Sequence, residues 1–158
     1  MADDVLARVS PAPARRWFAL VVLATLGGLL TWLGLTLTGG SAIGRSILVL
    51  AGLMSLALTY RLWSATTVGL VLTSAALTDT VGTVLITLDQ VKKVERSAFS
   101  FKPSNGFLII AKSKGASAVW APGLWWRFGR YIGVGGVCGA GQTKAMADIL
   151  AAEINDAD

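Results

Sequence analysis

The chain has 158 residues, of which 54% are hydrophobic, and its mean hydropathy of +0.64 is high for a water-soluble protein. Fourteen Lys and Arg against nine Asp and Glu give a net charge of +5, and the chain has no histidine. The lack of histidine removes the commonest general base and metal ligand, and with it the Ser-His-Asp and Cys-His catalytic arrangements.

The first segment, residues 1–16, carries Arg8, Arg15 and Arg16 among prolines, and we expect a short, poorly ordered or surface-lying cytoplasmic lead-in. The Arg15-Arg16 pair before an apolar run is similar to a twin-arginine export signal. The run that follows is long and Leu-rich, has no clear small-residue cleavage site, and precedes a second apolar run. These features favour two arginines that anchor membrane topology.

Residues 17–63 predict a two-helix membrane hairpin, with helices at about 17–38 and 42–63. No charge occurs from Trp17 to Gly44, and a helix of about 20 apolar residues can cross the hydrocarbon core. Thr38-Gly39-Gly40-Ser41 breaks the apolar run, because glycine favours turns. The second run contains Arg45 and Arg61 near its ends, where long side chains can reach the interface.

The flanks of the hairpin predict its orientation. Tyr60, Trp63 and Trp17 would share one interface, as in an aromatic belt. The basic residues at the chain-terminal end of the hairpin outnumber the single Arg45 near the loop, so the positive-inside rule puts both termini in the cytoplasm. Ala24/Gly28 and Ala51/Ser55 are small pairs four residues apart that permit close helix approach, although such pairs also arise by chance in apolar helices. We therefore expect a multi-pass membrane protein with both termini in the cytoplasm.

Residues 64–158 predict a small, mainly antiparallel β domain. Alternating apolar residues over 68–72 and 84–88 have strand periodicity, with a turn at 79–82 between them. Further strands are expected at 91–101, 107–112 and 117–121, and Pro103 and Asn105-Gly106 predict a tight turn before the fourth strand.

Two segments after the predicted strands, 123–132 and 143–155, have the residue spacing of helices. Apolar and aromatic residues of 123–132 follow helical spacing on one side, with Arg127 and Arg130 on the other. This pattern is typical of a short interfacial helix, and equally of a hydrophobic flap over the domain core. A glycine-rich link at 133–141 then leads to an amphipathic helix at 143–155, with Met146, Ile149, Leu150 and Ile154 on one face.

No motif in the chain indicates catalysis, a cofactor or a metal. Gly136–Gly141 followed by Gln142-Thr143-Lys144 resembles a phosphate-binding loop, but Gln142 replaces the required lysine and too little chain follows for the nucleotide-binding fold. The acidic residues are scattered, so a catalytic carboxylate pair is not supported. The lone Cys138 excludes an internal disulfide and a cysteine-based zinc site, and we expect a structural thiol rather than a reactive one.

The order of elements resembles the bacterial pleckstrin-homology-like domains that small membrane proteins carry after a two-helix hairpin. The stretches that suggest this are 69–73, 77–79, 84–96, 101–107 and 120–127. The resemblance implies an α+β multi-pass protein of a bacterial inner membrane, whose cytoplasmic domain is a strand meander closed by a C-terminal helix. Eukaryotic relatives bind phosphoinositides through basic residues in the loop after their first strand, and the corresponding stretch 74–83 has no Lys or Arg.

Two functions follow as hypotheses. The first is a non-enzymatic membrane-anchored interaction domain that docks another membrane protein within an inner-membrane complex, with no nucleic-acid partner. The second is recognition of anionic lipid by the basic-aromatic segment. The candidate partner or lipid surface combines aromatic and basic residues, since exposed Trp and Arg are typical interface anchors: Trp120, Trp125, Trp126, Arg127, Arg130, Lys92, Lys93 and Lys102. For the lysines, a plain solvent-facing surface is the favoured alternative.

Overall fold

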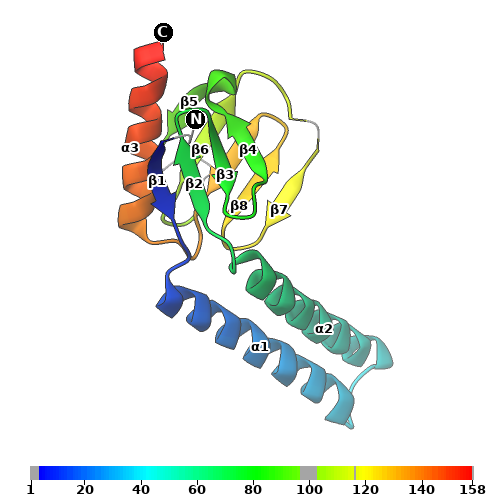
Figure 1. Ribbon diagram of the computed structural model, residues 1–158. Helices are drawn as coiled ribbons and strands as arrows, with labels where there is room; N and C mark the ends of the chain where they lie inside the picture. Colours follow the sequence, from blue (N-terminus) through cyan, green and yellow to red (C-terminus); the bar gives the residue numbers. More distant parts are fainter. Residues whose placement is uncertain (1–3, 97–102, 116, 158) are drawn as a thin grey trace. The chain divides into compact units, whose positions relative to one another are not determined.

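The computed structural model describes residues 4–96, 103–115 and 117–157 (Figure 1). These residues form two compact units: the hairpin, Pro13–Ser64, and a β domain made of Met1–Ala12 together with Ala65–Asp158. The hairpin is therefore an insertion within the chain of the β domain. Each unit is described by itself below.

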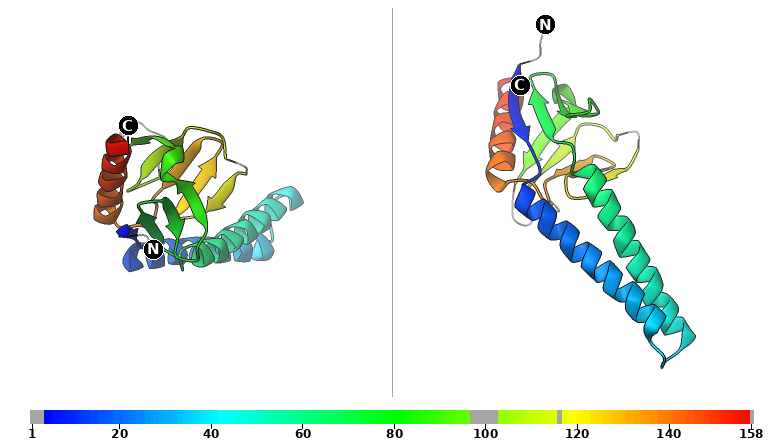
Figure 2. Two further views of the ribbon diagram at one scale, coloured as in Figure 1. Left: turned by 45° about the horizontal axis from the view of Figure 1, so that its top comes forward. Right: turned by 60° about the horizontal axis from the view of Figure 1, so that its bottom comes forward.

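The hairpin consists of α1, Pro13–Thr36, and α2, Ala42–Ala65, which run side by side (Figure 2). The chain reverses through Gly40, whose φ of +97° is readily adopted only by glycine. Ser41 caps α2, because its Oγ accepts a hydrogen bond from the Gly44 N–H at 3.1 Å. The predicted helices and the break between them are confirmed, and α1 begins four residues earlier than expected.

Small residues line the contact between α1 and α2. Gly27, Gly34, Gly52 and Ser55 are the buried small residues, and the Ser55 hydroxyl donates to the Leu23 carbonyl of the opposite helix at 2.9 Å. A Cβ added at Gly27 would lie 2.8 Å from Leu56 Cγ. Of the small residues expected at this contact, Gly28 instead faces open space. On α1 the contact therefore uses glycines seven residues apart, two helical turns, rather than four.

The β domain contains two antiparallel sheets. The four-stranded sheet has the order β1 (Val5–Val9), β2 (Leu70–Thr73), β3 (Ala76–Asp79) and β4 (Val84–Thr87). After the short 3-10 helix η1 (Leu88–Gln90), the five-stranded sheet has the order β5 (Val91–Glu95), β6 (Phe107–Ala111), β9 (Tyr131–Val134), β8 (Trp125–Phe128) and β7 (Val119–Ala121). The expected strands near 70, 84, 91, 107 and 119 are confirmed, while part of the expected strand 91–101 lies outside the described residues.

The N-terminal segment is a strand rather than a separate lead-in. β1 pairs antiparallel with β2, matching Val9 with Leu70 and Arg8 with Val71. Val9 is 1% exposed and belongs to the core of the domain. The expected boundaries at 16 and 64 are thus corrected: residues before the hairpin complete the sheet that the rest of the chain forms after it.

The segment 123–132 is a β-hairpin, so the expected interfacial helix is wrong. β8 and β9 pair antiparallel, and Gly129 has a φ of +60° in the two-residue turn between Phe128 and Tyr131. Strand periodicity places Trp125 and Arg127 on one face and Trp126 and Phe128 on the other. The aromatic residues fit both helical and strand spacing. Gly129 permits the tight turn that lets β8 pair with β9, and this favours strands.

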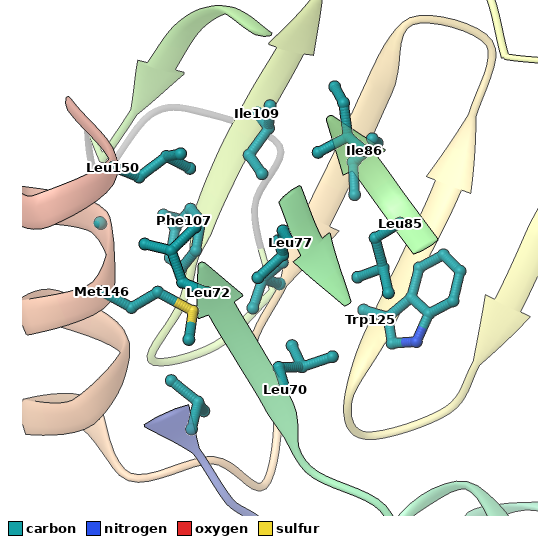
Figure 3. Packing of buried hydrophobic residues seen from close by; sticks show 14 of the residues in the cluster. Leu70, Leu72, Leu77, Leu85, Ile86, Phe107, Ile109, Trp125, Met146 and Leu150 are labelled. Carbon is teal, nitrogen blue, oxygen red and sulfur yellow. The ribbon is translucent and has the colours of Figure 1, made fainter. Parts of the chain in front are cut away.

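The core lies between the two sheets and under α3, Ala140–Ala157 (Figure 3). Met146, Ala147 and Leu150 are fully buried at helical spacing and pack with Phe107 and Leu72. The expected C-terminal amphipathic helix is confirmed, with α3 starting three residues earlier than predicted. These contacts tie α3 to both sheets, and in Figure 1 the helix runs beside β1.

The glycine-rich segment packs backbone against backbone. Gly135 and Gly136 have φ values of +145° and +108°, and a Cβ added at Gly135 would lie 2.7 Å from the Gly106 Cα. The facing turn holds Asn105 at a φ of +52°, and the Thr143 hydroxyl of α3 donates to the Asn105 carbonyl at 2.6 Å. The glycines therefore allow the expected Pro103–Gly106 turn to sit directly against the last strand.

Candidate functional site

An aromatic surface covers the outer side of the five-stranded sheet. The register aligns Trp120, Trp126, Gly133, Leu108 and Glu95 in one row across the strands β7, β8, β9, β6 and β5. The adjacent row on the opposite side holds the core residues. Because successive residues of a strand point to opposite faces, the first row faces away from the core.

Four aromatic side chains define this outer aromatic face: Trp120, Trp126, Phe128 and Tyr131. Phe128 is 71% exposed, Trp120 56% and Tyr131 50%. Trp126 is half-buried because its indole lies over Gly133, where an added Cβ would overlap the ring. Trp126, Phe128 and Tyr131 also line a hollow of about 600 Å³ with Leu108 and Glu95.

An ion pair borders the outer aromatic face on β5. Lys93 Nζ lies 3.0 Å from Glu95 Oε1, and both residues share the outer side because they are two apart in the strand. Exposed pairs of this kind contribute about 0–1 kcal/mol of stability. Lys93 is therefore matched by a carboxylate, and the exposed Lys92 is the neighbouring cation on the same strand.

Arg127 points to the inner side of its sheet, away from the outer aromatic face. It shares a register row with the core residues Ile132 and Ile109. Its Nη1 donates to the Leu85 carbonyl of β4 at 3.1 Å, which links the two sheets. Arg127 also lines a cleft of about 230 Å³ with residues 84–87 of β4. Arg127 therefore joins the two sheets and does not belong to the outer aromatic face.

The remaining residues of the predicted surface do not form one surface in the structure. Trp125 is 5% exposed and belongs to the core, so its assignment to a surface is wrong. Arg130 donates from Nε to the Ala111 carbonyl at 3.2 Å and from Nη2 to the Lys112 carbonyl at 2.6 Å. The predicted Lys102 lies outside the described residues. Of the predicted aromatic anchors, the structure brings together Trp120 and Trp126.

Phe128 and Tyr131 were missed as surface residues. The helical interpretation placed them with Trp125 on the apolar side of 123–132, facing either a membrane interface or the domain core. The alternation of Trp126 and Phe128 with Trp125 and Arg127 was the available signal, since a strand places such pairs on opposite faces. Pairing with β9 then adds Tyr131 opposite Phe128.

The domain interior contains a buried thiol. Cys138 is 0% exposed, and burial raises the pKa of its thiol to about 11. A thiol with so high a pKa is a weak nucleophile near neutral pH. Within 4–96, 103–115 and 117–157, no group of three His, Cys, Asp or Glu side chains could hold a metal ion.

Comparisons with protein-family models, with curated proteins and with solved structures find no match for this chain. The arrangement itself is therefore the basis for a functional proposal: two long apolar helices, two antiparallel sheets and a C-terminal helix.

Proposed function

We propose that the protein is a non-enzymatic integral membrane protein whose β domain docks a partner protein. The observation that carries the membrane part is the outward-facing apolar surface of the hairpin. The most apolar windows of α1 and α2 have mean hydropathies of 2.1 and 1.8, and only 17% and 11% of those windows is buried. In water such a surface is unfavourable, whereas in a bilayer it is solvated by acyl chains.

The orientation in this proposal follows the arginines. Arg15, Arg16 and Arg61 lie at the chain-terminal end of the hairpin, and Arg45 lies at the turn end. An excess of cations favours the cytoplasmic side, so both termini and the β domain are cytoplasmic in a bacterial inner membrane. The pleckstrin-homology-like assignment of the domain is part of the same proposal and is supported by the strand meander followed by a helix.

The docking part rests on the outer aromatic face. Trp120, Phe128 and Tyr131 are each at least half exposed on one side of one sheet, and neighbouring exposed aromatic residues mark interaction surfaces more often than isolated ones do. Tryptophan and tyrosine are also enriched among the residues that dominate binding energy at protein interfaces. Of the basic residues expected beside them, Arg127 is turned inward, Arg130 is bound to carbonyls and Lys93 is matched by Glu95, which favours a protein partner over an anionic lipid at this face.

The membrane part is tested by cysteine labelling in a Cys138→Ser background. Gly39→Cys, in the turn between the helices, is expected to react with a membrane-impermeant maleimide added outside intact spheroplasts. Ser74→Cys, exposed in the turn between β2 and β3, is expected to react only after lysis. Labelling of Ser74→Cys in intact spheroplasts, or release of the chain by alkaline carbonate, would contradict the proposal.

The docking part is tested by a photo-crosslinking amino acid placed at Trp120 or Phe128 in the native host. Irradiation is expected to give one protein adduct of defined mass from both positions. Val81 is a matched control, because it is 73% exposed and apolar but lies between β3 and β4 of the other sheet. Equal adducts from Val81, or lipid adducts alone from Trp120 and Phe128, would overturn the docking of a protein at this face.

A further inference from the structure

A cation–aromatic cluster occupies the end of the hairpin where α1 begins and α2 ends. The Arg16 guanidinium carbon lies 4.5 Å from the centroid of the Trp63 ring, and Arg16 Nη2 donates to the Trp63 carbonyl at 3.4 Å. Trp17 meets Trp63 edge to face, with ring centroids 5.4 Å apart and an interplanar angle of 68°. Trp63 therefore holds the Arg16 guanidinium against the end of α2, and Trp17 packs against Trp63.

The charge of this cluster is not neutralised within the hairpin. Arg15 and Arg61 lie at the same end as Arg16, and residues 13–64 contain no Asp or Glu. A guanidinium has five N–H donors, and Arg16 Nε is buried without a hydrogen-bond partner among the described residues. An anion is thus the chemical group that this end of the hairpin lacks.

We propose that Arg16, with Arg15 and Arg61, binds the phosphate of an anionic phospholipid. Guanidinium groups recognise phosphate through paired N–H donors, and tryptophans favour the headgroup level of a bilayer. This inference rests on the proposed membrane insertion of the hairpin. It concerns the hairpin itself and is independent of the outer aromatic face.

The surface beside the cluster identifies the occupant as a lipid rather than free phosphate. Trp17 and Phe18 are 55% and 72% exposed, and Val21 continues the apolar surface of α1 at 57%. An amphiphile can therefore place its phosphate at Arg16 and its acyl chains along the helix. Inorganic phosphate would use only the polar half of this site.

The test is lipid retention by the full chain, purified in mild detergent and measured by native mass spectrometry. Phosphatidylglycerol is expected to be retained at least five-fold more than phosphatidylcholine by the wild type. Arg16→Gln is expected to abolish this preference, and Arg45→Gln is the matched control, because Arg45 lies at the opposite end of the same hairpin and should leave it intact. Arg16→Lys keeps the charge but not the paired donors and should show a reduced preference.

Several results would overturn the inference. These are equal retention of the two lipids by the wild type, equal loss in Arg16→Gln and Arg45→Gln, or displacement of the lipid by an equal concentration of inorganic phosphate. Loss of the preference for phosphatidylglycerol in Arg16→Gln supports the inference if the circular dichroism of the variant matches that of the wild type. If Arg16→Lys also loses the preference while keeping native helicity, the result supports the need for paired donors. A chain that stays in carbonate-washed membranes without preferring anionic lipid overturns this inference alone, and a chain that washes out overturns the membrane proposal with it.

Discussion

The hairpin and the β domain place large and small side chains in opposite ways. The hairpin buries Gly27, Gly34 and Gly52 between its helices and exposes its large apolar residues, with Ile43 74% exposed. The β domain buries its large residues, such as Phe107 at 1% and Leu77 at 0%. The two units of the chain are therefore packed differently: small residues are buried in the hairpin, and large apolar residues are buried in the β domain.

The proposed membrane insertion gives this difference a physical origin, because the hairpin would then be solvated by lipid and the β domain by water. In water, removing apolar surface from solvent contributes about 25 cal/mol per Å², which favours a core of large side chains. In lipid that driving force between helices is absent, and association depends on close packing of small residues and on interhelical hydrogen bonds such as Ser55 to Leu23. The same kind of substitution is therefore expected to change stability differently in the hairpin and in the β domain.

The largest expected difference is between two leucines. Leu77→Ala in the core of the β domain should lower the free energy of unfolding by about 2–5 kcal/mol, because it removes a buried side chain and leaves a cavity. Leu35→Ala, at a residue 69% exposed on α1, should change it by less than about 0.5 kcal/mol. Urea titration of the detergent-solubilised full chain, followed by near-ultraviolet circular dichroism, measures both. Equal losses would contradict the inverted packing.

The buried thiol gives the next test. Because the pKa of Cys138 is raised to about 11 from 9.0, folded and unfolded states both keep the proton below pH 9. Between pH 9 and 11 only the unfolded state releases it, so this residue lowers stability as the pH rises, by up to about 2–3 kcal/mol. At pH 8, alkylation of the folded chain by iodoacetamide should be about 100-fold slower than in denaturant. A cysteine introduced at Gly39 in the hairpin turn is the comparison, and equal rates at both sites would show that Cys138 is accessible.

Two glycines of the hairpin separate its inner and outer sides. Gly52→Leu should destabilise the hairpin by about 1–3 kcal/mol, because the new Cβ would lie 2.8 Å from the Gly27 carbonyl and overlap Thr31. Gly28→Leu should be close to neutral, since nothing lies within 4 Å of that position. The loss of monodisperse chain on heating in detergent measures both, with a shift of several degrees expected for Gly52→Leu alone. A similar shift for Gly28→Leu would place the helix contact elsewhere.

The smallest expected effect concerns the link between the two sheets. Arg127→Met should cost about 1 kcal/mol, because it removes the hydrogen bond to the Leu85 carbonyl while keeping much of the apolar stem. Arg8→Met on the exposed edge strand β1 is the control and should lie within about 0.5 kcal/mol of the wild type. The same urea titration applies. If the two variants are equally stable, Arg127 makes no structural contribution and could again belong to a surface.

The elements that were predicted correctly are those whose signals are local. The hairpin helices follow from uninterrupted apolar runs, and α3 follows from the spacing of Met146 and Leu150. The Pro103–Gly106 turn follows from backbone preferences of proline, asparagine and glycine. Each of these signals lies within the segment that it describes.

The errors arise where the deciding information is distant. Val5–Val9 is only five residues long, and its partner β2 begins after the entire hairpin, so nothing nearby indicates a strand. In 123–132 the aromatic residues fit two periodicities, and pairing of β9 with β6 favours the strand. That pairing also decides which side of the sheet faces the core. Without it, the prediction from the sequence placed Trp125 and Arg127 on one surface with Trp120 and Trp126.

The insertion of the hairpin into the β domain has a consequence for biosynthesis. The ribosome releases Val5–Val9 roughly sixty residues before Leu70, the first residue of its partner strand. The nascent chain therefore carries an unsatisfied strand throughout the synthesis of both helices, and translation beyond Leu70 is required before it can be matched. A stalled or truncated product that ends within the hairpin lacks the partner of that strand and cannot complete the four-stranded sheet.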